Sequence, residues 1–245
     1  MSSVSLKELL EAGVHFGHQA RRWNPKMKQF IYTERDGVHV IDLTQTSARL
    51  DTAQDYVEDL VSRGGEIIFL GTKRQAQEIV KAEAERVGAM YLTERWIGGL
   101  FTNFEAILKN IKRLNELRRQ RDAKELSQFT KKEQLMIDRE IAKMERQFGG
   151  VDRIEKLPEA IFIIDAKKED NAVKEARRTG VKIVAIADTN CDPTLIDYPI
   201  PGNDDAIKAI MLLTKAVADA YAEGKALWGK QQEKLAAEVK DDGNK

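Results

Sequence analysis

Three short apolar runs, each followed by a helical pattern, constrain the fold of this 245-residue chain more than any other feature. The runs are Ile67 to Leu70, Ile161 to Ile164 and Ile183 to Ala187, and none shows the alternation of a strand with one face in water. Helical segments follow them at about 73–87, up to about 178, and at about 204–221. Strands that are apolar on both faces and alternate with helices indicate a parallel sheet covered on both sides. We therefore predict an α/β fold with a doubly wound parallel sheet.

Smaller elements are predicted before the first apolar run. Ser5 and Glu8 have the spacing of a capping box, which begins a helix. The Asp36-Gly37 pair favours the turn of a β-hairpin. The elements expected here are a helix at 5–11, an irregular arm at 13–28, strands at 28–33 and 38–43, and an amphipathic helix at 44–62.

A long segment without glycine or proline, residues 104–148, separates the second half of the α/β pattern from the first. Its apolar residues recur at alternating spacings of three and four, which gives a narrow heptad-like seam. They are Phe104, Ile107, Ile111 and Leu114, and then Ile137, Ile141, Met144 and Phe148. The pattern breaks at 126–131, so we predict two helices of about 20 residues that form an antiparallel coiled-coil hairpin. A seam this narrow suits one partner helix, so the hairpin is expected to protrude.

These patterns divide the chain into one discontinuous α/β domain, residues 1–103 and 150–228, and a helical-hairpin insertion, residues 104–149. The remaining segment, 229–245, is charged and is predicted to be disordered. The 40 Lys and Arg residues balance 40 Asp and Glu residues, yet the arm at 13–28 holds four cations and no acid. Because the field of a charge falls off within roughly 10 Å, this local excess matters more to a polyanion than the total does.

Several classes of protein are excluded. No apolar run approaches the roughly 18 residues of a transmembrane helix, so no membrane partner is expected. Glu8 and Glu11 stand where a signal peptide needs apolar residues. The single cysteine, Cys191, builds neither a disulfide framework nor a cysteine-based zinc site, and we interpret it as a loop or half-buried thiol. We expect a soluble intracellular protein.

The usual signatures of an α/β enzyme are absent from the sequence. There is no G-x-G-x-x-G after a strand, no G-x-x-x-x-G-K-[ST], and no G-x-S-x-G, and Cys191 has no nearby histidine. The residues therefore give no support for a nucleotide-dependent enzyme or for a serine or cysteine nucleophile. A metal-dependent or nucleotide-dependent activity at the strand ends is the alternative.

Asp165 and Asp188 each end a predicted strand, and Asp204 and Asp205 open the last predicted helix. Ligands of α/β folds bind at this edge of the sheet. Asp188, Asp204 and Asp205 are candidate ligands of a divalent cation, which prefers oxygen donors. The alternative is that Asp204 or Asn203 caps a helix and Asp188 organises a turn. His15 and His18 have a spacing that permits a zinc site, although polar loop residues explain them as well.

The arm is the strongest functional feature, because it interleaves cations with planar side chains. Lysine and arginine neutralise phosphates, and planar groups stack on unpaired bases, so these residues predict an RNA-binding arm. A basic strand edge that packs Trp23 inward is the equally weighted alternative. The candidate residues are His15, His18, Arg21, Arg22, Trp23, Lys26 and Lys28.

Two further groups of cations are weaker candidates. Lys73 and Arg74 lie in the turn where a strand meets a helix, where they can hold a phosphate, although an ordinary turn explains them too. The hairpin offers a second phosphate-binding surface, formed by Lys109, Lys112, Arg113, Arg118, Arg119 and Arg121. A hairpin or arm that docks a protein partner is the alternative, since the seam is apolar.

Four segments of the chain resemble one family. Residues 15–27, HFGHQARRWNPKM, closely resemble the N-terminal signature of the uS2 family of bacterial small-subunit ribosomal proteins. Residues 96–104, 158–165 and 200–206 resemble later motifs of that family, in the same order. The resemblance covers about residues 5–228.

The resemblance implies a flavodoxin-like domain with a protruding helical hairpin. It also implies a structural constituent of the small ribosomal subunit, located in the cytoplasm on the ribosome. Such a protein is not an enzyme, requires no cofactor and has no small-molecule substrate. Members of the family contact small-subunit ribosomal RNA between head and body, join late in assembly and take part in translation. Their partners include neighbouring ribosomal proteins, in many bacteria ribosomal protein S1.

Overall fold

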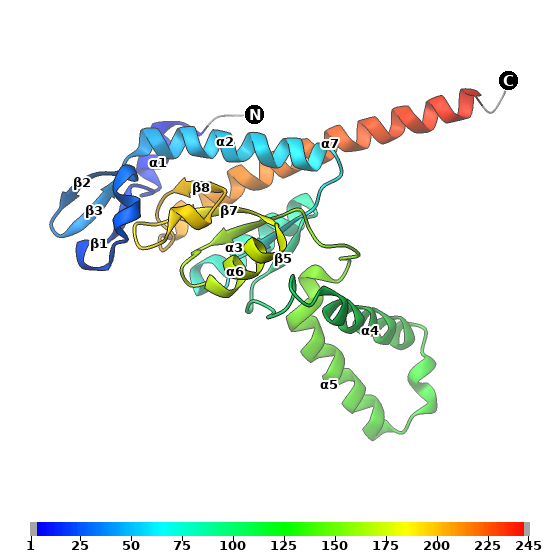
Figure 1. Cartoon of the computed structure of the whole chain (residues 1–245). Helices are drawn as coiled ribbons and strands as arrows, with labels where there is room; N and C mark the ends of the chain where they lie inside the picture. Colours follow the sequence, from blue (N-terminus) through cyan, green and yellow to red (C-terminus); the bar gives the residue numbers. More distant parts are fainter. Residues whose placement is uncertain (1–3, 243–245) are drawn as a thin grey trace.

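The computed structural model describes residues 4–242, without the side chains of Ser127 and of residues 235–242. Its main sheet is parallel and has the strand order β5-β4-β6-β7-β8 (Figure 1). The strands are β4 (Ile67–Leu70), β5 (Met90–Leu92), β6 (Ala160–Ile164), β7 (Lys182–Ala187) and β8 (Tyr198–Pro201). The three predicted strands are the three central ones, and every residue of β4 and β6 is fully buried. The parallel α/β prediction is confirmed.

Helices cover both faces of this sheet (Figure 1). One face packs on α2 (Leu43–Ser62), α3 (Arg74–Val87) and α7 (Ile207–Asp242). Phe69 of β4 meets Tyr221 of α7 there, with ring centroids 6.2 Å apart. The other face packs on α6 (Asp170–Thr179) and on the ends of two helices described below. Because successive strand residues point to opposite faces, Ile68 lies in the second core and Phe69 in the first.

The last helix is longer than the sequence patterns predict. We expected it to end near Tyr221 and residues 229–245 to be disordered, whereas α7 continues to Asp242. Residues 230–240 contain lysine, glutamine, glutamate, leucine and alanine, which favour helix, and neither glycine nor proline. The last three residues of the predicted tail lie outside the described part. Among the described helices, none combines the length and the hydropathy needed to cross a bilayer.

The arm is more regular than predicted, and this corrects the expectation of an irregular segment. It forms β1 (Phe16–Gln19) and two 3-10 helices, Ala20–Arg22 and Pro25–Phe30. Strand β1 pairs with β3 (Val38–Ile41), which also pairs with β2 (Ile31–Arg35) in a small antiparallel sheet. The arm is anchored because its backbone binds the loop after β7: Asn24 N donates to Thr189 O at 2.7 Å.

Two local predictions around this sheet, the capping box and the hairpin turn, are confirmed, and the start of one strand differs. Ser5 and Glu8 form the capping box of α1 (Leu6–Glu11). Asp36 and Gly37 both have positive φ angles, 52° and 75°, which a tight turn between β2 and β3 requires. Strand β2 begins three residues later than predicted, because Pro25–Phe30 forms a 3-10 helix that buries Met27 and Phe30.

Two helices occupy the segment between β5 and β6. They are α4 (Phe104–Asp122) and α5 (Lys131–Phe148), with a short 3-10 helix, Glu125–Gln128, between them. Ion pairs join the two helices, Arg113 to Glu140 at 2.7 Å and Arg118 to Glu145 at 2.9 Å. Seam residues such as Ile111, Leu114 and Ile141 are buried. Figure 1 shows α4 and α5 on the side of the sheet away from α2.

Candidate functional site

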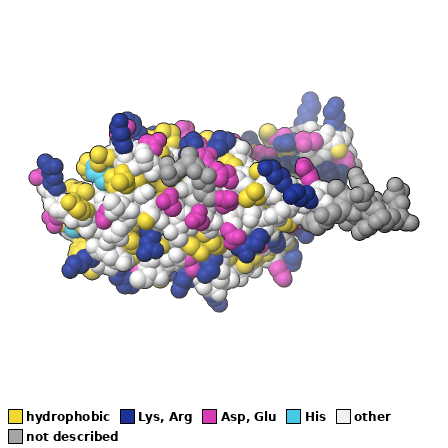
Figure 2. Space-filling view, turned by 90° about the horizontal axis from the view of Figure 1, so that it is seen from above, with side chains coloured by type: hydrophobic (Ala, Val, Ile, Leu, Met, Phe, Trp, Pro, Cys, Tyr) yellow, Lys and Arg dark blue, Asp and Glu magenta, His cyan; other side chains and the backbone are white. Residues whose placement is uncertain are grey.

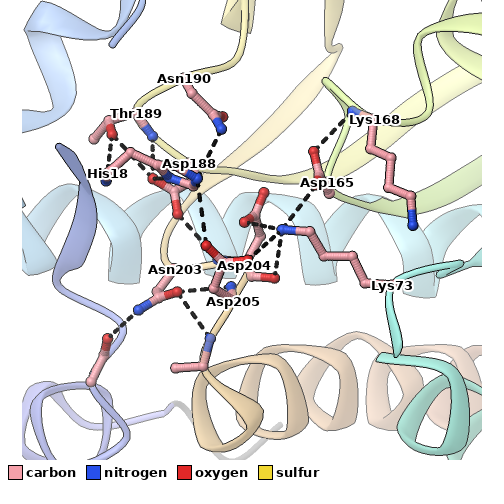
Figure 3. A network of polar contacts seen from close by, with 12 residues as sticks. His18, Lys73, Asp165, Lys168, Asp188, Thr189, Asn190, Asn203, Asp204 and Asp205 are labelled. Carbon is pink, nitrogen blue, oxygen red and sulfur yellow. Dashed lines mark hydrogen bonds and ion pairs between the residues drawn. The ribbon is translucent and has the colours of Figure 1, made fainter. Parts of the chain in front are cut away.

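A cluster of ionisable side chains lies at the carboxyl ends of the central strands (Figure 3). Asp165 follows β6 and Asp188 follows β7, while Asp204 and Asp205 lie between β8 and α7. Lys73 enters from the turn after β4. Since parallel strands end at one edge of the sheet, residues far apart in sequence meet there.

Lys73 lies at the centre of this cluster. Its Nζ is 2.6 Å from Asp204 Oδ1 and 2.8 Å from carboxylate oxygens of both Asp165 and Asp205. Burial lowers the pKa of Lys73, but its attraction to Asp204 and its hydrogen bonds to the three carboxylates outweigh burial and raise that pKa. The amino group is therefore a permanent counterion for the aspartates. This geometry does not favour the phosphate-binding role that the sequence assigned to Lys73, whereas its neighbour Arg74 is exposed.

Asp204 is deeply buried and, like Asp188, only 1% exposed. Burial and the charges of Asp188 and Asp165 raise its pKa to about 7, against the opposing effect of Lys73. Its Oδ2 atom has no hydrogen-bond partner among the described residues. Asp204 Oδ1 accepts a hydrogen bond from Lys73, while Asn203 Oδ1 accepts hydrogen bonds from Asp205 N and Ala206 N in the turn just before α7.

His18 joins the cluster from β1. Its Nδ1 lies 2.9 Å from Asp188 Oδ1, and this hydrogen bond raises the pKa of the imidazole against the effect of burial. His18, Asp188 and Asp204 each offer one ligand atom, and these atoms lie within 4.8 Å of one another. The exposed Asp205, which the sequence placed in a metal set, is not a member of this group. One imidazole and two carboxylates are the donor types of a divalent transition-metal site.

His15 is separate from this group. Its ring packs on Phe16, with centroids 4.0 Å apart, and it lines a different, mostly apolar hollow with Leu6, Leu10 and Tyr32. The two histidines therefore do not share a site among the described residues. His15 lies in the turn before β1 and His18 within β1, so their three-residue separation is not the helical spacing that would bring them together.

The arm cations differ in how they are partnered. Arg22 and Lys28 are exposed and form no side-chain hydrogen bond or ion pair with the described residues, whereas Arg21 Nε donates to Gln19 Oε1 at 3.0 Å. Lys26 is paired with Asp192 at 2.6 Å. Trp23 is half-buried, and its ring packs on His39 with centroids 5.0 Å apart. One side of the indole therefore contacts another residue of the protein, in agreement with the alternative that Trp23 packs inward.

The cations of α4 also fall into two classes. Lys109 and Lys112 are exposed and lack a side-chain partner in the described part of the chain. The four arginines of the predicted surface are paired with carboxylates: Arg113 with Glu140, Arg118 with Glu145 and Asp152, Arg119 with Glu116 and Glu125, and Arg121 with Asp122.

Basic side chains do not form one continuous patch on the face that Figure 2 presents, where they are interspersed with acidic ones. Two further lysines stand at the edge of the sheet where the cluster lies. Lys167 and Lys168 follow Asp165 and are exposed. They were not among the predicted site residues, although their position just after an apolar strand run is the same signal that points to Asp165 and Asp188.

Comparisons with known proteins agree on one family. The family model for ribosomal protein S2 matches residues 9–224. The chain is 53% identical over 225 residues to small ribosomal subunit protein uS2 of Acidothermus cellulolyticus, which covers 91% of this chain and 82% of that protein. It is 52% identical over 240 residues to the protein of that name from Mycolicibacterium vanbaalenii, covering 98% and 88%. For that from Solidesulfovibrio magneticus the identity is 53% over 226 residues, covering 92% and 88%.

Proposed function

This chain belongs to the ribosomal protein S2 family, and on that premise we propose that it binds small-subunit ribosomal RNA through its basic arm. The family membership makes it a structural constituent of the small ribosomal subunit and not an enzyme. Its partners are therefore ribosomal RNA and other ribosomal proteins. The finer proposal is that it lies between head and body, joins late in subunit assembly and acts in translation in the cytoplasm.

The observation that carries the RNA-binding proposal is the anchored, acid-free arm. Hydrogen bonds from His18 N and Asn24 N to Thr189 fix the arm against the sheet, so its cations are held in place before RNA binds. Arg22 and Lys28 are free to neutralise phosphates. Such contacts fix a protein on folded RNA by charge and shape, with little reading of base sequence.

We also propose that α4 and α5 form a helical hairpin that protrudes from one α/β domain and supplies a second contact surface. Lys109 and Lys112 are the available cations there, and the paired arginines shape the hairpin. Neighbouring ribosomal proteins, ribosomal protein S1 among them, are the protein partners proposed for the remaining exposed surface.

The test is sedimentation of cell lysates in sucrose gradients at moderate and high salt. The natural chain is expected to migrate with the small subunit and to be released as salt rises. An Arg21→Ala, Arg22→Ala double variant should be released at lower salt, because two phosphate contacts are lost. A Lys230→Ala, Lys234→Ala variant removes the same charge from exposed positions of α7 and should behave like the natural chain. Equal release of all three proteins would contradict the role of the arm.

A second proposal concerns the carboxylate cluster. We propose that His18, Asp188 and Asp204 hold a divalent cation, supported by their mutual distances and by the unpartnered Asp204 Oδ2. Equilibrium dialysis of the apo-protein with Zn²⁺ or Mg²⁺ should show one bound ion. His18→Ala should abolish this binding, whereas His15→Ala, which removes an imidazole outside the group, should not. Failure of the natural chain to bind either ion would refute the site.

A further inference from the structure

An open hollow of about 710 Å³ lies between the arm and the loop after β6. One wall comes from the arm and consists of His18, Arg21, Arg22 and Trp23. The other wall includes Lys167 and Lys168, and Asp165 and Asn190 complete the lining. The volume is within the range of roughly 300–1,000 Å³ that is typical of ligand sites. Two segments about 145 residues apart in sequence therefore face the same space.

Four cations surround this hollow, and their charges are not neutralised by carboxylates of the described residues. Arg22 and Lys167 form no side-chain hydrogen bond or ion pair there. Arg21 Nε donates only to the neutral Gln19, and Lys168 Nζ donates to the backbone oxygen of Thr72 at 3.1 Å. All four side chains are exposed, so they can turn toward a ligand at small cost.

Asp165 is the one carboxylate in the lining, and both of its oxygens already bind groups of the protein. Its Oδ1 accepts a hydrogen bond from Lys168 N at 2.9 Å, and its Oδ2 is paired with Lys73 at 2.8 Å (Figure 3). The buried aspartates behind it contact Lys73 and His18. The four cations therefore dominate the charge that the lining presents to solvent. A hollow with this charge favours an anionic ligand.

We propose that this hollow receives the phosphate backbone of an unpaired RNA nucleotide, with Lys167 and Lys168 as two phosphate ligands opposite Arg21 and Arg22. This inference rests on the proposed RNA-binding function of the arm, and it extends that surface to a second segment of the chain. Trp23 supplies a planar wall on which the base of the same nucleotide stacks, on the side of the indole that does not pack on His39.

The choice of RNA over a free nucleotide follows from the geometry. The cations stand on long, exposed side chains around an open hollow, so a continuous backbone can pass through it. Free nucleotides are commonly held by glycine-rich loops whose backbone amides surround the phosphates, and the loop Asp165–Glu169 contains no glycine. Contacts of this kind weaken with salt in proportion to the number of phosphates neutralised.

The experiment is a filter-binding titration of the full chain with purified small-subunit ribosomal RNA at several salt concentrations. Lys167→Ala, Lys168→Ala should lower the slope of log affinity against log salt by about 2, about one for each lysine. Lys167→Arg, Lys168→Arg should keep the slope of the natural chain. Lys230→Ala, Lys234→Ala is the charge-matched control, and urea unfolding confirms that each variant is folded.

The outcomes separate this inference from the function on which it rests. If Arg21→Ala, Arg22→Ala lowers the slope and Lys167→Ala, Lys168→Ala does not, the RNA-binding arm stands and the extended hollow is wrong. If neither variant lowers the slope, both proposals fail. A control variant that lowers the slope equally would show an effect of net charge and overturn the inference. Saturable binding of adenosine monophosphate that the lysine variant abolishes, with RNA binding unchanged, would assign the hollow to a free nucleotide instead.

Discussion

The carboxylate of Glu175 on α6 accepts a hydrogen bond from the indole Nε1 of Trp96 at 3.0 Å. The same carboxylate accepts bonds from the backbone N–H groups of Gly99, Phe101 and Thr102, and from the hydroxyl of Thr102. The loop 96–102 leads directly into α4. Glu175 therefore accepts hydrogen bonds from the loop that precedes α4, and it holds this loop against the α/β domain.

Replacing Glu175 by glutamine is expected to lower the free energy of unfolding by about 2 kcal/mol. Hydrogen bonds to a charged acceptor are worth about 1.5–3 kcal/mol, and the amide NH₂ of glutamine cannot accept the bonds from the loop. Urea unfolding measures the change. Glu78→Gln, the same substitution on an exposed face of α3, should change stability by less than about 0.5 kcal/mol.

The contribution of Glu175 should also depend on pH. Burial raises the pKa of Glu175, but the bonds from Gly99, Trp96, Thr102 and Phe101 outweigh it and hold that pKa below its usual 4.5. A depressed folded pKa means that the stabilisation is complete above 4.5 and is lost as pH falls through the lower folded value. The stability difference between the natural chain and Glu175→Gln should therefore be constant from pH 6 to 8 and shrink below about pH 4. A constant difference down to pH 3 would contradict this assignment.

Gly150 is expected to tolerate no side chain, because a Cβ atom there would overlap the backbone oxygen and the ring of Tyr91 in β5. The adjacent Gly149 is the natural control, since the nearest atom to its Cβ would be Arg118 Nη2 at 3.7 Å. Gly150→Ala should therefore destabilise the protein by about 1–3 kcal/mol, as overpacking does, and Gly149→Ala should be nearly neutral. Thermal unfolding of the two variants measures this difference. Equal unfolding midpoints would show that the contact with Tyr91 does not restrict position 150.

Asp204 should make the apo-protein less stable as pH rises. Its folded pKa of about 7 lies above the ordinary 3.8, so the folded state binds the proton more tightly than the unfolded state does. Stability then falls as pH rises from about 4 to 7. Asp204→Asn removes this titration, so in chelator the variant should gain stability relative to the natural chain across that window. A difference that does not change with pH would show that Asp204 stays ionised.

The sequence revealed the centre of the sheet better than its edges. The runs at 67–70, 161–164 and 183–187 are apolar on both faces because β4, β6 and β7 are flanked by strands and covered by helices. The two unpredicted strands, β5 and β8, are the edge strands. β5 has only three residues, and β8 contains Pro199 and Pro201, which argue against a strand unless it lies at an edge.

The candidate site was predictable in composition but not in pairing. Asp188 was identified because it ends a predicted strand, and Asp204 because it opens the last predicted helix. The pairing of Lys73 with Asp165, Asp204 and Asp205 was not predictable, because these partners lie in two other loops far away in the sequence. His18 joins this group because part of the arm forms strand β1. The sequence of the arm has no alternating pattern, so this strand was not predicted.

The cations of α4 offer the last prediction, which rests on the proposed contact between this helix and RNA. Lys109 and Lys112 are three residues apart and share a helix face, whereas Arg113 and Arg119 already bind Glu140, Glu116 and Glu125. A phosphate must displace those carboxylates to reach the arginines, but it reaches the lysines directly.

We therefore expect Lys109→Ala, Lys112→Ala to lower the salt-dependence slope of RNA binding by about 2. Arg113→Ala, Arg119→Ala, which removes the same formal charge, should lower the slope less and instead reduce the thermal unfolding midpoint, because the Arg113–Glu140 pair joins α4 to α5. Filter binding and thermal unfolding of the same two preparations give both readouts. A larger loss of slope for the arginine variant would show that RNA displaces the carboxylates, and that the ion pairs of the free protein do not decide which cations bind phosphate.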